Sequence, residues 1–397
     1  MKKKHVCMIA YTGYARDTRV RREAETLALN GYKVSFLVPR SGTAEKAKTY
    51  EQDGVSVIEL NTTKYCGKSK ISYLFSYLYF TLACFFVCTW RCLKGHIDVV
   101  HVHNMPNFLV FTALLPRLLG KKLILDIHDT VPETYMAKFG DAGQSPSVAF
   151  WLFCLEEKIC CCLAHKIICV NHTQKDVLVQ RGIPGNKIEI SLNVPDHRRF
   201  GMNSERRNQD PMEPTPGFKL VYHGTLARRL GLDLAIKAVA DLTGRIPDIE
   251  FHIIGGGDDQ VEFARYSKEM KLEGHVFFEG FCPVESLVSV LSGMDVGVIP
   301  NRKSIASDLM LPVKMLEYVA LNIPVVAPRL KTIERYFTEE MARYYEPGNV
   351  DDLARAIYDL KSDESLRNNQ IREARKFLER YGWERHHQDL LNLYQAV

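Results

Sequence analysis

Two neighbouring arginines in the second half of the chain have the side chains needed to bind a pyrophosphate. Arg228 and Arg229 follow the turn Gly224-Thr225 and precede Gly231, where a helix is expected to begin. Two guanidiniums beside a helix N-terminus can bridge phosphate oxygens bidentately. The spacing therefore predicts a pyrophosphate site. The alternative is an arginine pair exposed on the surface.

The segment 311–328, LPVKMLEYVALNIPVVAP, contains the second candidate. Its pattern predicts a loop that ends at Pro312, a helix over 313–321, a turn and a buried strand. The free N–H groups at the start of such a helix favour a bound phosphate. Glu317 lies one to two turns further on, where its carboxylate could accept hydrogen bonds from two ribose hydroxyls. The alternative is a glutamate on the exposed face of an ordinary helix.

In the first half, polar residues gather in the loops that follow buried strands. Ligands of open α/β sheets bind at this carboxyl edge. The residues concerned are Gly13, Asp17 and Arg19 after the strand 5–11, and His128, Asp129 and Glu133 after the strand 123–127. A histidine flanked by acidic residues at this edge favours a functional role, whereas Asp17 and Arg19 equally suit a solvated helix start.

The sequence gives little support for nucleic-acid or metal binding. The net charge is only +5, so nucleic acid is not an indicated partner. His101 and His103 share one face of a predicted strand, with no third metal ligand in view. Cys84, Cys88 and Cys92 share a helix face without histidine or aspartate partners, which favours packing. Because no secretory signal is recognisable, we expect reduced thiols in a cytoplasm.

Strands and helices alternate along the chain and must position these residues. At 397 residues the chain is too long for one core and suits two domains. The alternation predicts an α/β fold with two doubly wound sheets, one over 1–200 and one over 218–380. Between them, 201–217 contains three prolines and little apolar material, which predicts a linker. The ligand edges of the two sheets are expected to face one another.

The stretch 71–90, ISYLFSYLYFTLACFFVCTW, carries no charge over twenty residues. Its length would permit a membrane span. It also suits a helix docked into its own domain, or a helix that lies partly in a membrane interface. A span is disfavoured because the strand 98–102 continues the same domain. The basic residues that flank 71–90 support the interfacial alternative.

Several motifs together resemble a known family. In the second half they are HGTLARRLG, IIGGG, FFEGF, MDVGVIP, PVKMLEYVALNIPVVAP and EPGNVDDLARAI. In the first half they are GYARDTRVRREAETLALNGYKVSFLVP and LDIHDTVPE. These motifs resemble the retaining glycosyltransferases of family 4, which have the GT-B fold, over nearly the whole chain.

The resemblance implies two Rossmann-like domains that face a cleft. A nucleotide-sugar donor, a UDP- or GDP-sugar, would bind mainly to the second domain and the acceptor to the first. Residues 381–397 would form a helix that crosses back to the first domain. Neither a metal nor another cofactor is expected.

The resemblance also implies roles for individual residues. His128, Arg229 and Arg228 would be catalytic; the family usually has a lysine where Leu230 stands, and Arg228 is the nearest substitute. The expected donor-binding residues are Gly13, Gly224, Thr225, Gly255, Phe281, Leu311, Pro312 and Glu317. Acceptor-side residues would be Asp17, Arg19, Asp129 and Glu133. Around Glu317 the sequence has the variant P-x-K-x-x-E-Y, with Pro312, Lys314 and Tyr318.

The expected function is retaining transfer of a hexosyl or N-acetylhexosaminyl group to a hydroxyl of a lipid-linked saccharide, in bacterial surface polysaccharide assembly. The protein would be cytoplasmic, peripheral on the inner face of the plasma membrane, with membrane contact through 71–94. A soluble sugar acceptor is the alternative. Two rivals of other classes are a GT-B-fold sugar-nucleotide epimerase and an inactive nucleotide-sugar binding protein.

Overall fold

The computed structural model describes residues 4–15, 17–40, 46–65, 67, 69–139, 147–196, 200 and 217–397. The chain separates into two units. Unit 1 comprises residues 1–193 and 387–397, and unit 2 comprises residues 194–386. The predicted linker, 201–217, lies outside the described residues except for Gly217.

Unit 1 is built on an eight-stranded sheet in the order β3-β4-β2-β1-β5-β6-β7-β8. All paired strands are parallel except β3 and β4. The strands are β1 (His5–Ile9), β2 (Lys33–Arg40), β3 (Thr49–Gln52), β4 (Val55–Thr63), β5 (Val99–His103), β6 (Lys122–Ile127), β7 (Lys166–Cys169) and β8 (Ile188–Ile190). Because the central strands are buried on both faces, they are continuous apolar runs.

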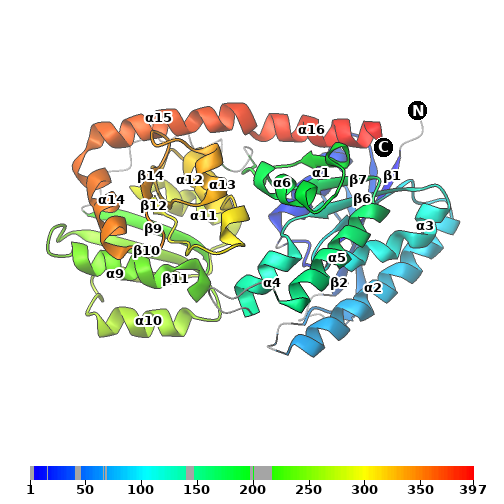
Figure 1. Ribbon diagram of the computed structural model, residues 1–397, viewed down its shortest axis with the longest axis horizontal. Helices are drawn as coiled ribbons and strands as arrows, with labels where there is room; N and C mark the ends of the chain where they lie inside the picture. The colour runs from blue at the N-terminus through cyan, green and yellow to red at the C-terminus, as the bar shows by residue number, and fades with distance from the viewer. Residues whose placement is uncertain are drawn as a thin grey trace. The chain divides into compact units, whose positions relative to one another are not determined.

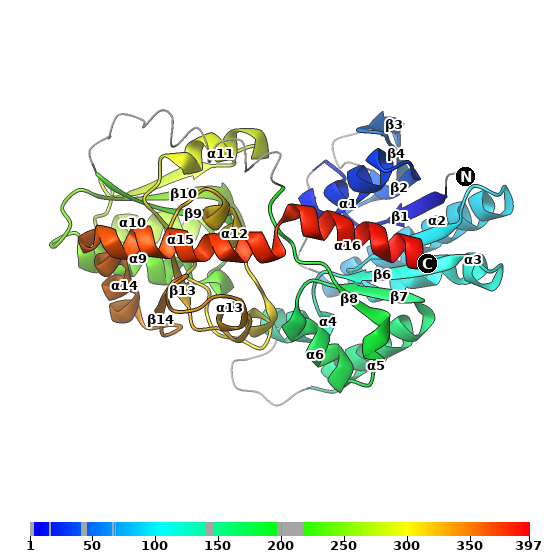
Figure 2. The same ribbon diagram turned by 90° about the horizontal axis from the view of Figure 1, so that it is seen from above.

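Helices cover both faces of this sheet (Figure 1). They are α1 (Thr18–Leu29), α2 (Lys70–Leu93), α3 (Leu114–Leu118), α4 (Val131–Phe139), α5 (Val148–Leu163) and α6 (His172–Gln180), with the 3-10 turns η1 (Asn107–Ala113) and η2 (Gly185–Lys187). The last eleven residues, within α16 (Trp383–Ala396) and after it, also belong to unit 1. Figure 2 shows this part of α16 alongside α1, and the Tyr394 hydroxyl lies 2.7 Å from Nδ1 of His101.

Unit 2 has a six-stranded, fully parallel sheet in the order β11-β10-β9-β12-β13-β14. The strands are β9 (Phe218–Thr225), β10 (Ile249–Gly256), β11 (Val276–Gly280), β12 (Val296–Val298), β13 (Val325–Pro328) and β14 (Arg343–Tyr345). The helices are α9 (Leu232–Leu242), α10 (Gln260–Glu269), α11 (Val284–Ser292), α12 (Val313–Ala320), α13 (Lys331–Tyr336), α14 (Val350–Ser362) and α15 (Glu364–Tyr381), with η3 (Arg228–Leu230) and η4 (Ser307–Leu309). The prediction of two Rossmann-like α/β units is confirmed.

Helix α2 buries only one of its faces. Phe80, Cys84, Cys88 and Cys92, spaced by four residues, lie in the apolar core of unit 1. This confirms a packing role for the cysteines. The rest of the helix is largely exposed. Residues 71–93 are long and apolar enough to cross a membrane, and only 22% of the 18-residue window that meets this test is buried.

Candidate functional site

The floor of the candidate donor site is made of two glycines at the carboxyl edge of the unit 2 sheet. Gly224 of β9 and Gly255 of β10 are paired in register. A Cβ on Gly255 would lie 2.0 Å from the Gly224 carbonyl oxygen, and both glycines have positive φ. The backbone of β9 therefore excludes a side chain at Gly255, and Gly224 is exposed at the sheet edge where ligands of parallel sheets bind. Thr225, next to Gly224, is exposed.

The two candidate phosphate arginines lie in η3, but their surroundings differ. Arg228 is 67% exposed and pairs with Glu262 of α10, Nη1 to Oε1 at 3.2 Å. Arg229 is also exposed, and it is close enough to Lys314 to lower the pKa of that lysine. Of the predicted pair, Arg229 therefore lies within electrostatic range of the site residue Lys314. Arg228 instead forms an ion pair on the surface.

Lys314 belongs to the site, although its spacing alone predicted no role for it. This lysine of α12 is half-buried, and its Nζ lies 3.7 Å from the ring centroid of Tyr222. A Cβ on Gly224 would lie 3.3 Å from the same Nζ, so the ammonium lies at the glycine floor. Burial lowers the pKa of Lys314 to about 7, with Arg229 acting in the same direction and Glu317 opposing. The signal that could have identified it was the P-x-K-x-x-E-Y motif.

Glu317 is held in place by two residues of the surrounding structure. Its Oε2 accepts a hydrogen bond from Nε2 of His223, at 2.6 Å, at the end of β9. Nδ1 of His223 lies 3.0 Å from the buried Tyr318 hydroxyl. The Tyr318 ring occupies the space beside Gly297, where a Cβ would lie 2.2 Å from it. Oε2 is thus engaged, and Oε1 of this half-buried carboxylate can accept from a ligand. His223 was missed from sequence, although it directly precedes Gly224.

The remaining donor-side candidates of unit 2 are Pro312, Leu311 and Phe281. Pro312 is buried and caps α12 without a side-chain hydrogen bond, so the first N–H groups of α12 are left for other acceptors. Leu311, immediately before it, is half-buried. Phe281, after β11, is 82% exposed. Among the described residues, no hydrogen bond, ion pair or ring contact joins Phe281 to Glu317.

In unit 1, His128 lies at the carboxyl edge of β6, where its ring contacts the buried carboxylate of Asp126. Nε2 of His128 donates to Oδ2 of Asp126 at 2.9 Å, and Nδ1 of His103 lies 3.1 Å from the same oxygen. The backbone N–H of His128 donates to Oδ1 of Asn104 at 2.8 Å. Although burial opposes the charged form, the Asp126 carboxylate raises the pKa of His128 above its usual value. The ring is thus oriented by Asp126, which sequence reasoning missed inside the apolar run LILDI.

Arg19 is buried inside unit 1 and not exposed at the edge of the sheet. Its guanidinium binds both carboxylate oxygens of Asp126, Nη2 to Oδ1 at 2.8 Å and Nε to Oδ2 at 3.1 Å. Its Nη1 donates to the Ser191 carbonyl at 3.0 Å. The expected acceptor-side role is therefore corrected: Arg19 can affect an acceptor only through Asp126 and His128.

Two further acceptor-side candidates have structural partners. Glu133 is buried and forms an ion pair with Arg181, so it is likewise not available to an acceptor. Asp17 caps α1, its Oδ1 accepting from the Val20 N–H at 3.4 Å. Asp129, the remaining acceptor-side candidate, is exposed at the edge of the sheet, as is Gly13, which was expected to bind the donor.

Within the described residues, one buried group has the side chains to hold a metal ion. Glu23, His101, His103 and Asp126 place one ligand atom each within 4.8 Å of one another. The Arg19 guanidinium binds Asp126 and lies 3.3 Å from Oε1 of Glu23, so a metal ion would meet a buried positive charge. Burial and the adjacent Asp126 carboxylate raise the pKa of Glu23. Because a metal ligand must be a charged carboxylate, this shift also disfavours a metal ion at Glu23.

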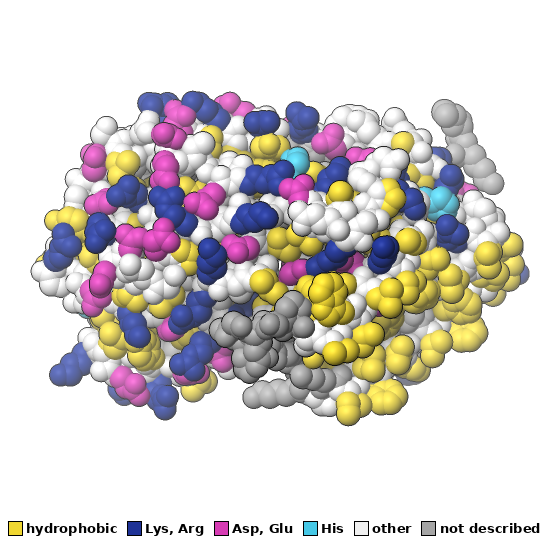
Figure 3. All heavy atoms as spheres, viewed as in Figure 1, with side chains coloured by type: hydrophobic (Ala, Val, Ile, Leu, Met, Phe, Trp, Pro, Cys, Tyr) yellow, Lys and Arg dark blue, Asp and Glu magenta, His cyan; other side chains and the backbone are white. Residues whose placement is uncertain are grey.

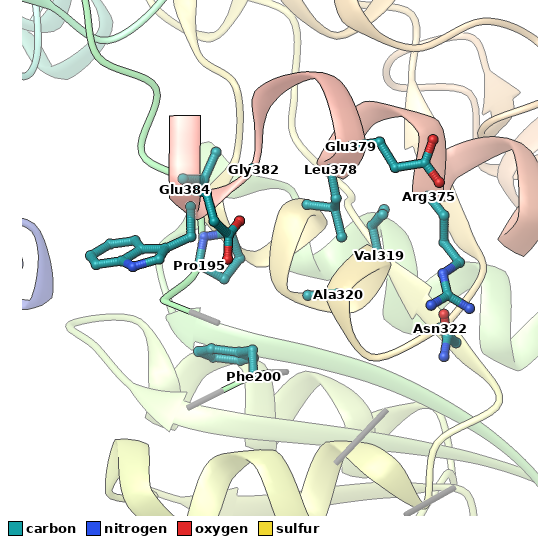
Figure 4. A pocket seen from close by; sticks show the side chains of 12 residues that line it. Pro195, Phe200, Val319, Ala320, Asn322, Arg375, Leu378, Glu379, Gly382 and Glu384 are labelled. Atoms are coloured by element: carbon teal, nitrogen blue, oxygen red, sulfur yellow. The ribbon is translucent and has the colours of Figure 1, made fainter. Parts of the chain in front are cut away.

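A separate cavity of about 280 Å³ lies in unit 2 at the C-terminal end of α12, beside α15. Figure 4 shows Val319 and Ala320 of α12 close to Leu378 of α15, and all three line the cavity. Neither Lys314 nor Glu317 lines this cavity. We therefore assign it no part in donor binding.

Two family profiles match the chain in succession. The profile described as "Glycosyltransferase Family 4" matches residues 17–199, and the one described as "Glycosyl transferases group 1" matches residues 203–377. They correspond closely to the two halves of the chain.

Curated relatives are distant. The chain is 24% identical over 190 residues to "Amylovoran biosynthesis glycosyltransferase AmsK" of Erwinia amylovora, covering 47% of this chain and 45% of that protein. It is 25% identical over 170 residues to "Phosphatidyl-myo-inositol mannosyltransferase" of Mycolicibacterium smegmatis, covering 43% and 42%. These two matches span less than half of each relative. A third, 24% identical over 398 residues, covers 95% of this chain and 89% of "D-inositol 3-phosphate glycosyltransferase" of Corynebacterium urealyticum.

Solved structures agree with the fold over the whole chain. A sucrose-phosphate synthase from Thermosynechococcus elongatus superposes with a TM-score of 0.79 at 17% identity, covering 99% of both chains. The Anabaena protein Alr3699/HepE superposes with a TM-score of 0.71 at 14% identity, covering 99% of this chain and 100% of the other. The two family profiles show that the chain belongs to family 4 of the glycosyltransferases, and the two parallel-sheet units and the superpositions agree with its GT-B fold.

Proposed function

We propose that this protein transfers a sugar from a nucleotide-sugar donor to an acceptor hydroxyl with retention of the anomeric configuration. The observation that carries the proposal is the position of Lys314 and Glu317 beside the glycine floor of unit 2, with Arg229 within electrostatic range of Lys314. In this arrangement the two cationic side chains receive the diphosphate, and Glu317 accepts hydrogen bonds from the ribose. Cationic and N–H donors already in position stabilise the charge that develops on the leaving group.

The reaction exchanges one glycosidic bond for another. The bond from the anomeric carbon to the diphosphate oxygen breaks, and a bond to the acceptor oxygen forms on the same face of the sugar. The acceptor proton passes to the departing phosphate oxygen. His128, held by Asp126, would orient the donor sugar. We propose no metal in this step, because Arg229 and Lys314 supply the positive charge that a metal would otherwise provide.

For the acceptor we propose a lipid-linked saccharide in surface polysaccharide assembly, and for the donor a hexosyl or N-acetylhexosaminyl nucleotide. The names of two curated relatives support this choice of acceptor: one is an amylovoran biosynthesis glycosyltransferase and the other a phosphatidyl-myo-inositol mannosyltransferase. The apolar surface of unit 1 supports it independently. The protein would then be peripheral on the cytoplasmic face of a membrane.

The outward sides of α2 and α5 form an exposed apolar face (Figure 3). It consists of Ile71, Leu74, Phe75, Leu78, Tyr79, Leu82, Phe86, Trp90 and Leu93 of α2 and Val148, Trp151, Leu152, Leu155 and Ile159 of α5. Contiguous apolar surface of this kind marks an interaction site. We propose that it lies in the membrane interface.

The apolar face predicts how single charges change vesicle binding. Trp151→Glu, at a side chain that is 63% exposed, should weaken binding to phosphatidylcholine–phosphatidylglycerol vesicles at least tenfold, because it removes aromatic surface and adds a charge. Val261→Glu, at a residue of α10 that is 83% exposed, is the matched control and should bind as wild type does. Co-sedimentation measures both. Equal binding by the two variants would contradict membrane contact through this face.

The lowered pKa of Lys314 predicts that nucleotide binding takes up a proton. At pH 8 the free lysine, with a pKa of about 7, is mostly neutral, and an adjacent diphosphate raises its pKa and recharges it. Isothermal titration of UDP or GDP in two buffers of different ionisation enthalpy should show uptake approaching one proton at pH 8. The uptake should diminish below pH 6 and be absent in Lys314→Met. Identical binding enthalpies in the two buffers at pH 8 would rule this role out.

The proposed reaction is tested by product analysis. The protein is incubated with UDP- and GDP-sugars and with lipid-linked saccharides, without added metal, and the new linkage is examined by NMR. A product with the donor's anomeric configuration supports the proposal. An inverted product would exclude retention. Interconversion of free nucleotide-sugars without acceptor would indicate an epimerase, and binding without turnover an inactive binding protein.

A further inference from the structure

A groove of about 240 Å³ opens in unit 1 beside the apolar face. Its walls come from four elements: Tyr73 and Tyr77 of α2, Phe108 of η1, Thr134 and Lys138 of α4, and Phe153 of α5. Sites that enclose a drug-sized ligand have about 300–1,000 Å³, so this groove suits part of one hydrocarbon chain and not a whole lipid.

The chemistry of the groove is apolar with one positive end. Aromatic rings line it, with Tyr73 and Tyr77 at a centroid distance of 6.0 Å and Tyr77 and Phe108 at 6.4 Å. Lys138 is exposed, and its Nζ lies 5.4 Å from the Tyr73 ring centroid. A hydrocarbon chain that carries a phosphate matches this combination, because the ammonium can pair with the phosphate while the chain contacts the rings.

The groove is connected to the edge where His128 lies. Met105 and Pro106, which line it, directly follow Asn104. The Asn104 side chain accepts from the His128 N–H at 2.8 Å and donates to the Asp129 carbonyl at 2.7 Å. One side of the groove therefore adjoins the edge of the sheet where His128 lies, within reach of the head group of a molecule anchored there.

We infer that the groove binds the hydrocarbon chain of the acceptor lipid next to its phosphate, with the phosphate at Lys138 and the saccharide directed towards His128. The identification of this lipid as the acceptor rests on the proposed function. The groove explains a feature that membrane contact alone does not require: a recess and a cation next to a surface that is already apolar.

Photocrosslinking tests the chain site without relying on activity. The probe is a long-chain alkyl phosphate with a diazirine on the chain, placed in phosphatidylcholine vesicles, and labelled peptides are mapped by mass spectrometry. We expect labelling of the peptides that contain Phe108 and Thr134. Thr134→Trp, at a half-exposed position, should fill the groove and reduce that labelling at least tenfold, and Val261→Trp should not. Labelling confined to the outward residues of α2, equal in wild type and Thr134→Trp, would overturn the inference.

A second variant tests whether the exposed Lys138 binds the phosphate. Because this side chain is on the surface, its replacement should not unfold the protein. Lys138→Gln should reduce groove labelling by the alkyl phosphate at least threefold and leave labelling by the corresponding diazirine alcohol unchanged. Equal loss with both probes, or no loss with either, would contradict a phosphate at Lys138.

Transfer assays connect the groove to the acceptor and separate its failure from that of the proposed function. Thr134→Trp should lower kcat/KM at least tenfold for a saccharide on a long-chain phosphate, and leave unchanged the rate with the same saccharide on a methyl group. Equal loss with both acceptors would overturn the assignment of the groove to the acceptor chain. Groove labelling in a wild-type protein that transfers to no acceptor would instead overturn the proposed function and support the groove as a lipid site.

Discussion

Replacing Arg229 with alanine is expected to lower kcat with the true donor by about 10²-fold or more. In the proposed mechanism its guanidinium meets a diphosphate whose negative charge grows as the glycosidic bond breaks. Losing one positioned transition-state donor costs roughly 10²–10³ in kcat in well-studied enzymes. Arg229 is exposed and within electrostatic range of Lys314, so the substitution should leave the free energy of unfolding nearly unchanged.

Arg228 provides the matched control for this experiment. It is the adjacent arginine in η3, yet it is exposed and paired with Glu262 at 3.2 Å, an arrangement that contributes little to stability. Arg228→Ala should keep kcat within about threefold of wild type. If Arg229→Ala also stayed within about threefold, the role of Arg229 would be wrong. If Arg228→Ala caused the larger loss, the two assignments would have to be exchanged.

Replacing Lys314 with methionine is the second change with a large expected effect. Methionine keeps most of the length of the side chain against the Tyr222 ring but removes the ammonium at the glycine floor. We expect kcat/KM to fall by about 10²-fold, because the leaving diphosphate loses one of its two cationic partners. Initial rates over a range of donor concentrations measure the effect.

The same substitution should not destabilise the protein, which distinguishes a functional lysine from a structural one. A lowered pKa means that the folded state binds fewer protons than the unfolded chain between about pH 7 and the ordinary lysine value. The charged lysine therefore opposes folding, most strongly below pH 7. Lys314→Met should unfold at the wild-type temperature or above it at pH 6. A large loss of stability together with unchanged kcat/KM would show that Lys314 is structural.

Sequence reasoning identified the edges of the sheets well, because position at an edge follows from local pattern. Gly224 and Glu317 both lie in unit 2, as expected, since an apolar strand followed by glycine, and a proline before a helix, are local signals. The two Rossmann-like units follow from the same alternation of strands and helices.

The direction of individual side chains was harder to predict, because it depends on partners far away in the chain. Arg19 was expected at the acceptor edge, but its guanidinium binds Asp126, more than a hundred residues later. The position of Lys314 depends on Tyr222 and Gly224, some ninety residues before it. The motif P-x-K-x-x-E-Y draws attention to the lysine, but no spacing within 311–328 shows the distant contacts on which its role depends.

For helix α2, the sequence could not predict which face is buried. Its composition and length permit a span, a docked helix or an interfacial helix, and the strand that follows disfavours the span. The structure shows that one face, with Phe80, Cys84 and Cys88, is in the core and the other is exposed. An uncharged helix hides this asymmetry, because both of its faces are apolar in sequence.

Thermal unfolding in the presence of UDP, GDP, ADP and CDP, without metal, tests most directly whether the edge of unit 2 holds a nucleoside diphosphate. A ligand that binds only the folded state stabilises it by about 2.7 kcal/mol at a hundred times its Kd. We expect a clear rise in unfolding temperature with one base. The rise should be much smaller for Glu317→Gln, because the neutral amide loses the charge that strengthens hydrogen bonds from the ribose hydroxyls, and its NH2 group cannot accept from His223. No rise with any of the four in a folded sample, or the same rise in Glu317→Gln, would contradict donor binding at this edge.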